Sequence, residues 1–319
     1  MPRFLSPKEL LSIMAVPLPL GPAPMPIADT DPDPGLFGPE SVTWKVLREP
    51  LLILAGARAL LLQAAHPHVA QGAIDHSSYA TDPFGRLMRT TDWAGAVAFG
   101  TTAEAEAAAA RVNRMHRKVA GTLPRGRGSR KVKAGSAYNA MDPDLLLWVH
   151  ATFVDTLLVA HDRLVGGLTE PERDAFVHEW DAVARLMGVP EQLLWGDHAA
   201  MAAYVDEQVE HGFARPAAGS RLVAATILHP PLPSPLLRPL MDTLAFIAVG
   251  FLPATTRKAY RITWTPAHEA AHLSLELMVR NTRRGMPRAL RVAPIYDFAL
   301  SRTLGRLRDG SDRRLQGAA

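Results

Sequence analysis

The segment Leu51–Ala65, LLILAGARALLLQAA, carries apolar side chains on almost every side of a helix. A helix that is hydrophobic all round has to be surrounded by other elements, because exposing any of its faces to water costs free energy. The helix is expected to end at His66, since the following Pro67 disfavours helical geometry in the residue before it. This segment therefore predicts a central helix with the rest of the chain packed around it.

The composition favours further helices around that centre. Hydrophobic residues make up 48% of the 319 residues, and alanine and leucine outnumber the β-branched residues that favour strands. Polar N-caps mark several helix starts, at Ser41, Thr101 and Asp142 among others. Helices are expected at residues 41–48, 51–65, 69–79, 84–97, 101–121, 142–161, 169–188, 198–212, 239–252, 266–280 and 291–308.

These patterns predict an all-α fold, a single multi-helical domain of about ten helices with no β-hairpin. The domain is expected to span residues 41–310. Residues 1–40 are rich in proline and are expected to form an extended arm, and residues 311–319 a disordered tail. Gly121 is expected to follow the 101–121 helix as a left-handed cap residue.

The chain has no cysteine. This excludes disulfides, iron–sulfur clusters, thiolate-ligated haem, cysteine zinc sites and a cysteine nucleophile. Any bound metal would have to be held by carboxylates, by some of the 12 histidines, or by minor ligands such as methionine or tyrosine.

The charge is modest, with a formal net value of +4. Much of it lies in the Gly-rich segment Arg125–Lys133, which is either a solvated loop or a contact for an anionic partner. Aromatic residues are not interleaved with these charges, so no nucleic-acid partner is expected.

Two apolar stretches bear on location. Leu10–Leu20 is interrupted by Pro17 and Pro19, so no secretory leader is expected. Leu240–Pro253 covers about 14 residues, short of the roughly 20 that span a bilayer. It is expected to be a core helix, with peripheral membrane contact as the alternative, and the protein is expected to be cytoplasmic.

His116 lies on the apolar face of the 101–121 helix when residues are placed at 100° intervals. The side chains on that face are expected to be Ala105, Ala108, Ala109, Val112, Met115, His116 and Val119. An inward histidine at this position is either a hydrogen-bonded core residue or a ligand, and the neighbouring alanines leave room for a flat group or for a close helix.

Other histidines and two arginines add to this region. His150 lies among apolar residues, so its ring is expected to be buried and to need partners. His76 follows an aspartate and precedes a serine, as in a helix-end cap. Arg86 and Arg89, with Thr90 beside them, are either a surface pair or a clamp for an anionic group. A metal or cofactor pocket is one hypothesis for so many histidines in and between apolar helices.

The segment His268–His272 matches the pattern H-E-x-x-H, which in zinc hydrolases holds a metal between two histidines on one helix face. The next acidic residue, Glu276, would lie about 12 Å from His268 along the helix, too far to share one metal. No histidine follows Arg280 to supply a third ligand. A zinc hydrolase using His268, Glu269 and His272 is therefore a weaker alternative.

Five ordered segments, at residues 33–44, 56–79, 82–90, 99–121 and 142–158, closely resemble the MpaB-type oxygenase family, which shares its catalytic domain with the latex-clearing rubber oxygenases. The resemblance covers about residues 33–300. It implies an all-helical, distantly globin-like domain that holds one b-type haem.

The resemblance also implies roles for individual residues. In the rubber-oxygenase branch, a histidine downstream of an R-x-x-K-T motif is the axial haem ligand. The matching residues here are Arg86–Thr90 and His116, so His116 is the expected iron ligand. Arg89 stands where that branch has lysine, and an arginine cannot act as a neutral ligand, which suggests a different substrate.

The leading hypothesis is thus a haem b-dependent oxygenase that uses O2 on an apolar, terpenoid or lipid substrate. Arg86, Thr90 and His150 are the candidate catalytic residues. His116, Arg86, Arg89 and His76 are the candidate haem-binding residues. A non-enzymatic haem or lipid carrier with the same fold is the alternative.

Overall fold

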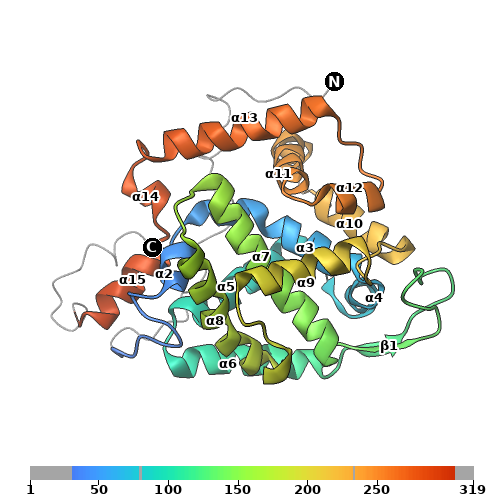
Figure 1. The fold of residues 1–319 in the computed structure, drawn as a ribbon, viewed down its shortest axis with the longest axis horizontal. Helices are drawn as coiled ribbons and strands as arrows, with labels where there is room; N and C mark the ends of the chain where they lie inside the picture. Colours follow the sequence, from blue (N-terminus) through green and yellow to red (C-terminus); the bar gives the residue numbers. More distant parts are fainter. Residues whose placement is uncertain (1–30, 79–80, 233, 306–319) are drawn as a thin grey trace.

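The computed structural model describes residues 31–78, 81–232 and 234–305. The fold is 68% helical, and the described residues form 14 α-helices and two short strands, so the prediction of a single all-α domain is confirmed (Figure 1). The α-helices are α2 (Val42–Leu47), α3 (Gly56–Ala65), α4 (Pro67–His76), α5 (Pro83–Phe99), α6 (Thr102–His116), α7 (Pro143–Leu164), α8 (Glu170–Met187), α9 (His198–Glu210), α10 (Ala218–Leu228), α11 (Arg238–Gly250), α12 (Ala254–Ala259), α13 (Pro266–Arg283), α14 (Arg288–Arg291) and α15 (Pro294–Thr303).

The predicted central helix is present but begins as a tighter coil. A 3₁₀-helix, η1 (Pro50–Ala55), leads into α3, which ends at His66 as expected before Pro67. Two further short 3₁₀-helices are η3 (Glu191–Leu193) and η4 (Pro235–Leu237). The η1–α3 segment packs against α7, α10 and α11, so other helices surround it.

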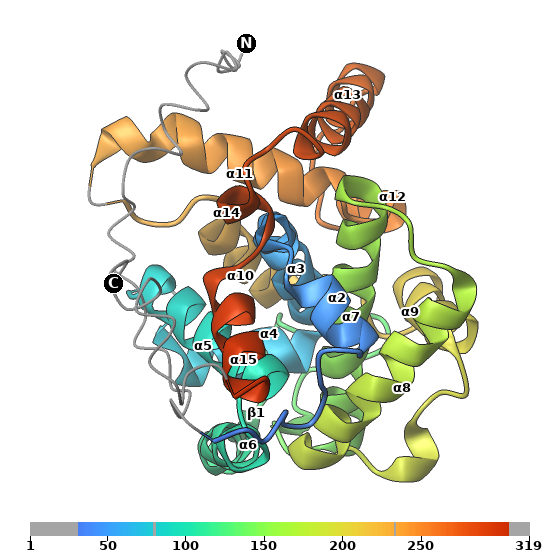
Figure 2. The ribbon, with the colours of Figure 1, turned by 90° about the vertical axis from the view of Figure 1, so that its left-hand side faces the viewer.

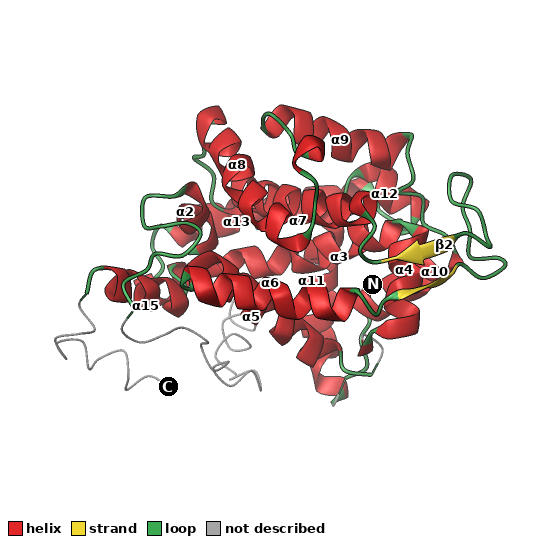
Figure 3. Cartoon of the chain, turned by 90° about the horizontal axis from the view of Figure 1, so that it is seen from below, coloured by secondary structure: helices red, strands yellow, loops and turns green. Residues whose placement is uncertain are grey.

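The second central element is α7, which crosses the middle of the molecule (Figures 1 and 3). Asp142 caps its first turn by accepting a hydrogen bond from the backbone N–H of Asp144, and Pro143 occupies the first helical position. Among the described residues, α7 is the one helix long and apolar enough to cross a membrane, and most of its apolar stretch is buried inside the fold.

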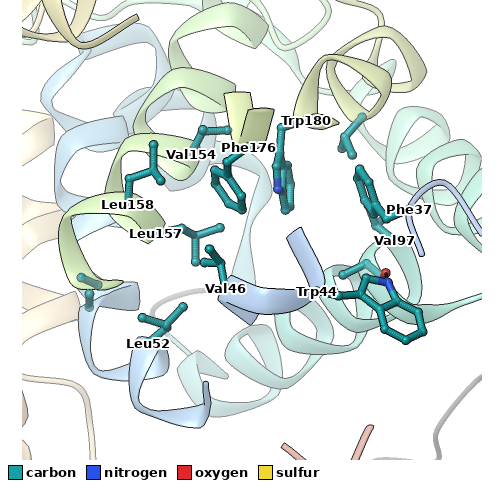
Figure 4. Close-up of a cluster of buried hydrophobic side chains, with 14 of the residues drawn as sticks. Phe37, Trp44, Val46, Leu52, Val97, Val154, Leu157, Leu158, Phe176 and Trp180 are labelled. Atoms are coloured by element: carbon teal, nitrogen blue, oxygen red, sulfur yellow. Dashed lines mark hydrogen bonds between the residues drawn. The ribbon is translucent and has the colours of Figure 1, made fainter. Parts of the chain in front are cut away.

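The largest buried cluster joins α2, α5, α7 and α8 (Figure 4). Trp44 lies in it fully buried, and its indole Nε1 donates to the Ala98 carbonyl at 2.8 Å. Phe176, Trp180 and Val154 fill the space between α7 and α8. Burying each such side chain contributes about 1.5–3 kcal/mol, so this cluster fixes how the helices around the candidate site are placed.

Part of the predicted arm lies against the domain. The Asp33 carboxylate accepts hydrogen bonds from the backbone N–H and the hydroxyl of Thr102, at the start of α6. Phe37 packs on Trp180 at 6.2 Å between ring centroids. Residues 1–30 of the arm and the predicted tail 311–319 lie outside the described residues.

The structure corrects the prediction that the chain has no β-hairpin. Strands β1 (Ala120–Thr122) and β2 (Ala137–Asn139) pair antiparallel, and the basic segment Arg125–Lys133 lies in the loop between them. The helix predicted to run to Gly121 therefore ends at His116. Gly121 is a strand residue, and a Cβ there would lie 2.6 Å from the Tyr138 hydroxyl, so glycine serves close strand packing rather than a helix cap.

Candidate functional site

Helices α5 and α6 are joined by a short turn at Gly100 and Thr101 and pack against each other. At 1.5 Å per residue, Arg86 lies about 20 Å from the turn on α5, and His116 about 21 Å from it on α6. The two residues, 30 positions apart in the sequence, therefore lie at the ends of α5 and α6 that are remote from this turn.

The apolar face predicted for α6 is largely confirmed. Ala105, Ala108 and Ala109 are buried. Asn113 donates from Nδ2 to the Leu186 carbonyl at 2.8 Å, which holds the C-terminal half of α6 against α8. The inclusion of Met115 on this face was wrong: its side chain is 57% exposed, because consecutive residues of a helix point about 100° apart and Met115 therefore points away from His116.

His116 is half-buried, and its Nδ1 atom is buried without a hydrogen-bond partner. Burial lowers the pKa of the ring below its ordinary value, so the imidazole is neutral at neutral pH. A neutral, unpartnered ring nitrogen is the donor that axial ligation of a haem iron requires. The residue predicted as the iron ligand thus has chemistry that fits the group.

On α5, the candidate residues Arg86 and Thr90 lie on the same side of the helix as residues that reach the core. Arg86, Thr90, Trp93 and Val97 recur at helical spacing, and Trp93 packs edge-on against Phe153 of α7 at 6.0 Å. The Thr90 hydroxyl donates to the Arg86 carbonyl within the same helix. Arg86 and Thr90 therefore lie on the same side of α5 as Trp93 and Val97, in the half of the helix that is less buried.

Arg89 occupies a different position from Arg86. Its guanidinium donates to the Asp82 carboxylate and to the Ser78 hydroxyl, both at 3.1 Å, on the exposed start of α5. The hydrogen bond from Arg89 lowers the pKa of Asp82, which also caps the helix through the backbone N–H of Gly85. In this arrangement Arg89 stabilises the start of α5.

His76 lies at the end of α4, close to the chain that follows His116. Its Nε2 is 3.1 Å from the Ala120 carbonyl and 3.3 Å from the Tyr138 hydroxyl. Tyr138 donates to the Asp75 carboxylate at 2.5 Å, and burial together with this bond raises the pKa of Tyr138. Sequence reasoning missed Tyr138, because its contact depends on the hairpin.

His150 is placed differently again, between two tryptophans. Its ring stacks on Trp195 at 6.3 Å and lies 6.5 Å from Trp180, and burial lowers its pKa to about 4. Trp180 contacts Phe153, which in turn contacts Trp93 of α5. His150 is therefore linked to α5 through aromatic rings and forms no hydrogen bond with the candidate residues of α5 and α6 described above.

This aromatic chain was not foreseen from the sequence. The indole Nε1 atoms of Trp93 and Trp180 are buried without a hydrogen-bond partner. Orphaned buried donors are rare in folded proteins, since each costs about 1–3 kcal/mol. Trp180 is fully buried in the core whereas Trp93 is half-buried, so of the two indoles that of Trp93 is the one a ligand can approach.

The H-E-x-x-H segment is a structural contact. Thr265 caps α13 by accepting from the backbone N–H of His268, and the His268 Nδ1 accepts in return from the backbone N–H of Thr265 at 3.1 Å. His272 is buried, donates from Nε2 to the Ile247 carbonyl at 3.0 Å, and places Nδ1 2.9 Å from the Glu276 carboxylate. Glu269 accepts from Trp264 and Arg257. Nowhere in the described ranges do three or more such side chains gather to hold a metal, so the zinc-hydrolase alternative has no site.

The close packing of the His272 ring against α11 gives a testable prediction. A Cβ at Gly250 would lie 1.9 Å from the His272 ring, so Gly250→Ala must displace a buried imidazole and weaken its bond to Ile247. The expected loss in the free energy of unfolding is about 1–3 kcal/mol, measured by urea denaturation.

The matched control is Gly56→Ala at the start of α3, where nothing lies within 4 Å of an added Cβ. That change is expected to raise the free energy of unfolding by about 0.4–1 kcal/mol, because alanine restricts the unfolded chain. Equal effects of the two substitutions would contradict this account of His272.

Comparison with known proteins places this geometry in a family. Residues 44–284 match the family described as ER-bound oxygenase mpaB/B'/Rubber oxygenase, catalytic domain. Two relatives, uncharacterised proteins from Mycobacterium bovis and Mycobacterium tuberculosis, are each 24% identical over 239 residues, which cover 74% of this chain and 90% of each relative. No solved structure matches the chain.

The family match includes α5, α6, α7 and α8, and with them every candidate site residue. It spans well over half of the chain and agrees with the resemblance seen in the sequence. The chain therefore belongs to the mpaB/rubber oxygenase catalytic-domain family, a family of oxygenases.

Proposed function

We propose that this protein is a haem b-dependent oxygenase that acts with O2 on an apolar small molecule. The observation that carries the proposal is the buried, unpartnered Nδ1 of the neutral His116 imidazole, at the C-terminal end of α6. Membership of an oxygenase family supports the class of reaction. A bound haem would supply the oxygen chemistry, and the chain would supply ligation, polarity and access.

The roles of the other residues follow from their positions. His116 would hold the iron, and Arg86, near the start of α5, would bind a carboxylate of the haem or of the substrate. The unpartnered indole of the half-buried Trp93 would donate a hydrogen bond to a polar atom of a ligand beside it. His150 would stay neutral and keep the aromatic wall apolar enough for a hydrocarbon.

Arg89 supports a substrate other than rubber. Its bonds to Asp82 and Ser78 employ the guanidinium at the start of α5, and it carries no lone pair at neutral pH to offer an iron. We infer that Arg89 acts indirectly, by holding the start of α5 and so the position of Arg86.

An absorption spectrum tests the proposal. The protein, expressed with ample haem precursor, is expected to show a Soret band that His116→Ala abolishes and His268→Ala retains. Circular dichroism of both variants establishes that they are folded. A colourless native protein would overturn the proposal, as would a Soret band unchanged in His116→Ala.

Oxygen uptake separates the oxygenase from a non-enzymatic carrier. An oxygenase is expected to consume O2 when a terpenoid or other lipid alkene is added, and to lose this uptake in His116→Ala. A haem-loaded protein with no substrate-dependent uptake across such alkenes would instead favour the carrier.

A further inference from the structure

The outer face of α13 exposes a row of apolar side chains. Leu273 is 47% exposed, Leu277 59% and Met278 40%. The inner face of the same helix packs on α7 and α11 through buried residues such as His272 and Glu276. The helix lies along one edge of the molecule, so its outer face has no covering element within the described part of the chain (Figures 1 and 2).

A groove extends this row toward α12. It has a volume of about 570 Å³, and its lining residues include Trp264, Pro266, Ala270 and Leu273. The charged groups of its wall neutralise one another, because Arg257 pairs with Glu269 at 3.1 Å and lies over the Trp264 ring at 4.9 Å. The groove and the leucines therefore form one continuous apolar surface.

Cationic side chains follow the leucines on the same face. Pro266, Ala270, Leu273, Leu277, Arg280 and Arg284 recur at the spacing that places them along one side of a helix. Arg280 and Arg284 are exposed and form no ion pair with any residue of the described ranges. The two glutamates of α13 are paired with Arg257 and with His272 and Arg163, so the outer face offers only positive charge.

We propose that this outer face of α13 docks on the surface of an anionic lipid bilayer. The leucines would enter the boundary between head groups and acyl chains, and Arg280 and Arg284 would contact lipid phosphates. A second copy of the chain fits less well, because the same face has no carboxylate to meet those arginines. The surface lies on the opposite side of the molecule from α6, so docking anchors the protein rather than opening its candidate site (Figure 1).

Co-sedimentation of the full chain with vesicles tests the proposal. Vesicles of phosphatidylcholine containing phosphatidylglycerol are expected to bind the protein, and vesicles of phosphatidylcholine alone to bind it more weakly. The double variant Leu273→Glu, Leu277→Glu is expected to bind at least about tenfold more weakly. The double variant Arg280→Gln, Arg284→Gln is expected to bind anionic vesicles about thirtyfold more weakly, from about 1 kcal/mol for each arginine.

The matched control is Leu222→Glu on α10, where the leucine is 47% exposed, the same fraction as Leu273. This variant is expected to bind like the native chain. The proposal is overturned if the native chain ignores anionic vesicles, or if the control loses binding equally. It is also overturned if the leucine variant splits a native dimer, which would assign the face to a second copy. If the native chain binds no vesicles and the leucine variant unfolds at a lower temperature than the native chain, the outer face of α13 would be assigned to contact with another segment of this chain.

Discussion

Arg58→Met is expected to lower the free energy of unfolding by about 3–5 kcal/mol, because it leaves a buried carboxylate without its cation. Arg58 is 3% exposed and lies 2.7 Å from the Asp155 carboxylate. It also donates to the Phe251 carbonyl at 2.9 Å and to the Thr156 hydroxyl at 2.7 Å. One side chain of α3 therefore ties together α7 and the end of α11.

The measurement is urea denaturation at neutral pH, with Arg185→Met as the control. Arg185 pairs with Glu191 at 2.9 Å on the surface, and loss of such an exposed pair costs about 0–1 kcal/mol. Adding Asp155→Leu to Arg58→Met is expected to restore part of the loss, since the unpaired charge is then removed. Arg58→Met costing no more than the control would contradict the role assigned to this ion pair.

Acid is expected to destabilise the protein well above the pH at which carboxylates titrate. Burial lowers the pKa of His66 to about 3 and that of His161 to about 4. In the unfolded chain both titrate near 6.5, so below that pH the unfolded state binds more protons than the folded state. Their stabilising effect is complete above pH 6.5 and is lost as the pH falls toward the folded pKa values.

Between pH 7.5 and pH 5 each of these two histidines is expected to reduce the free energy of unfolding by roughly 2 kcal/mol. The lowered pKa of His150 acts in the same direction. Glu276 contributes only at lower pH. Its burial alone would raise its pKa, but the bond from His272 and the charge of Arg163 lower it, so its effect is lost as acid protonates it.

Urea denaturation across this pH range measures the effect, and His161→Leu is the diagnostic variant. His161 is 2% exposed and its Nδ1 has no partner, so leucine removes a titrating group without removing a hydrogen bond from that atom. The slope of stability against pH is expected to decrease in this variant. A native chain whose stability is flat between pH 7.5 and pH 5 would contradict the prediction.

Helix starts were predictable because their causes are local. The capping boxes at Thr101 with Glu104 and at Thr169 with Glu172 are present in the structure, as is the cap at Asp142. Each involves residues three positions apart or fewer, so the sequence holds all the interacting groups. The end of α6 was not predictable, because the hairpin that follows His116 depends on residues 137–139.

In the candidate site too, some features followed from local sequence patterns and others depend on contacts between distant residues. The inward placement of His116 followed from helical periodicity. The contacts of His150 with Trp180 and Trp195 join residues that no local pattern connects. The distant likeness to globins and the bound haem stay predictions, the first because no solved structure matches the chain.

The sequence by itself determined that the chain is helical, where most helices begin, and which family it belongs to. Those properties depend on composition, on caps within one turn, and on motifs that lie in order along the chain. Only the tertiary structure decided which histidines remain chemically available. His272 and His116 both face inward on amphipathic helices, yet the Nε2 of His272 donates to the Ile247 carbonyl and its Nδ1 lies 2.9 Å from the Glu276 carboxylate, while the buried Nδ1 of His116 has no hydrogen-bond partner. The difference arises because the Ile247 carbonyl belongs to α11, another helix, and packing alone brings it within hydrogen-bond distance of His272.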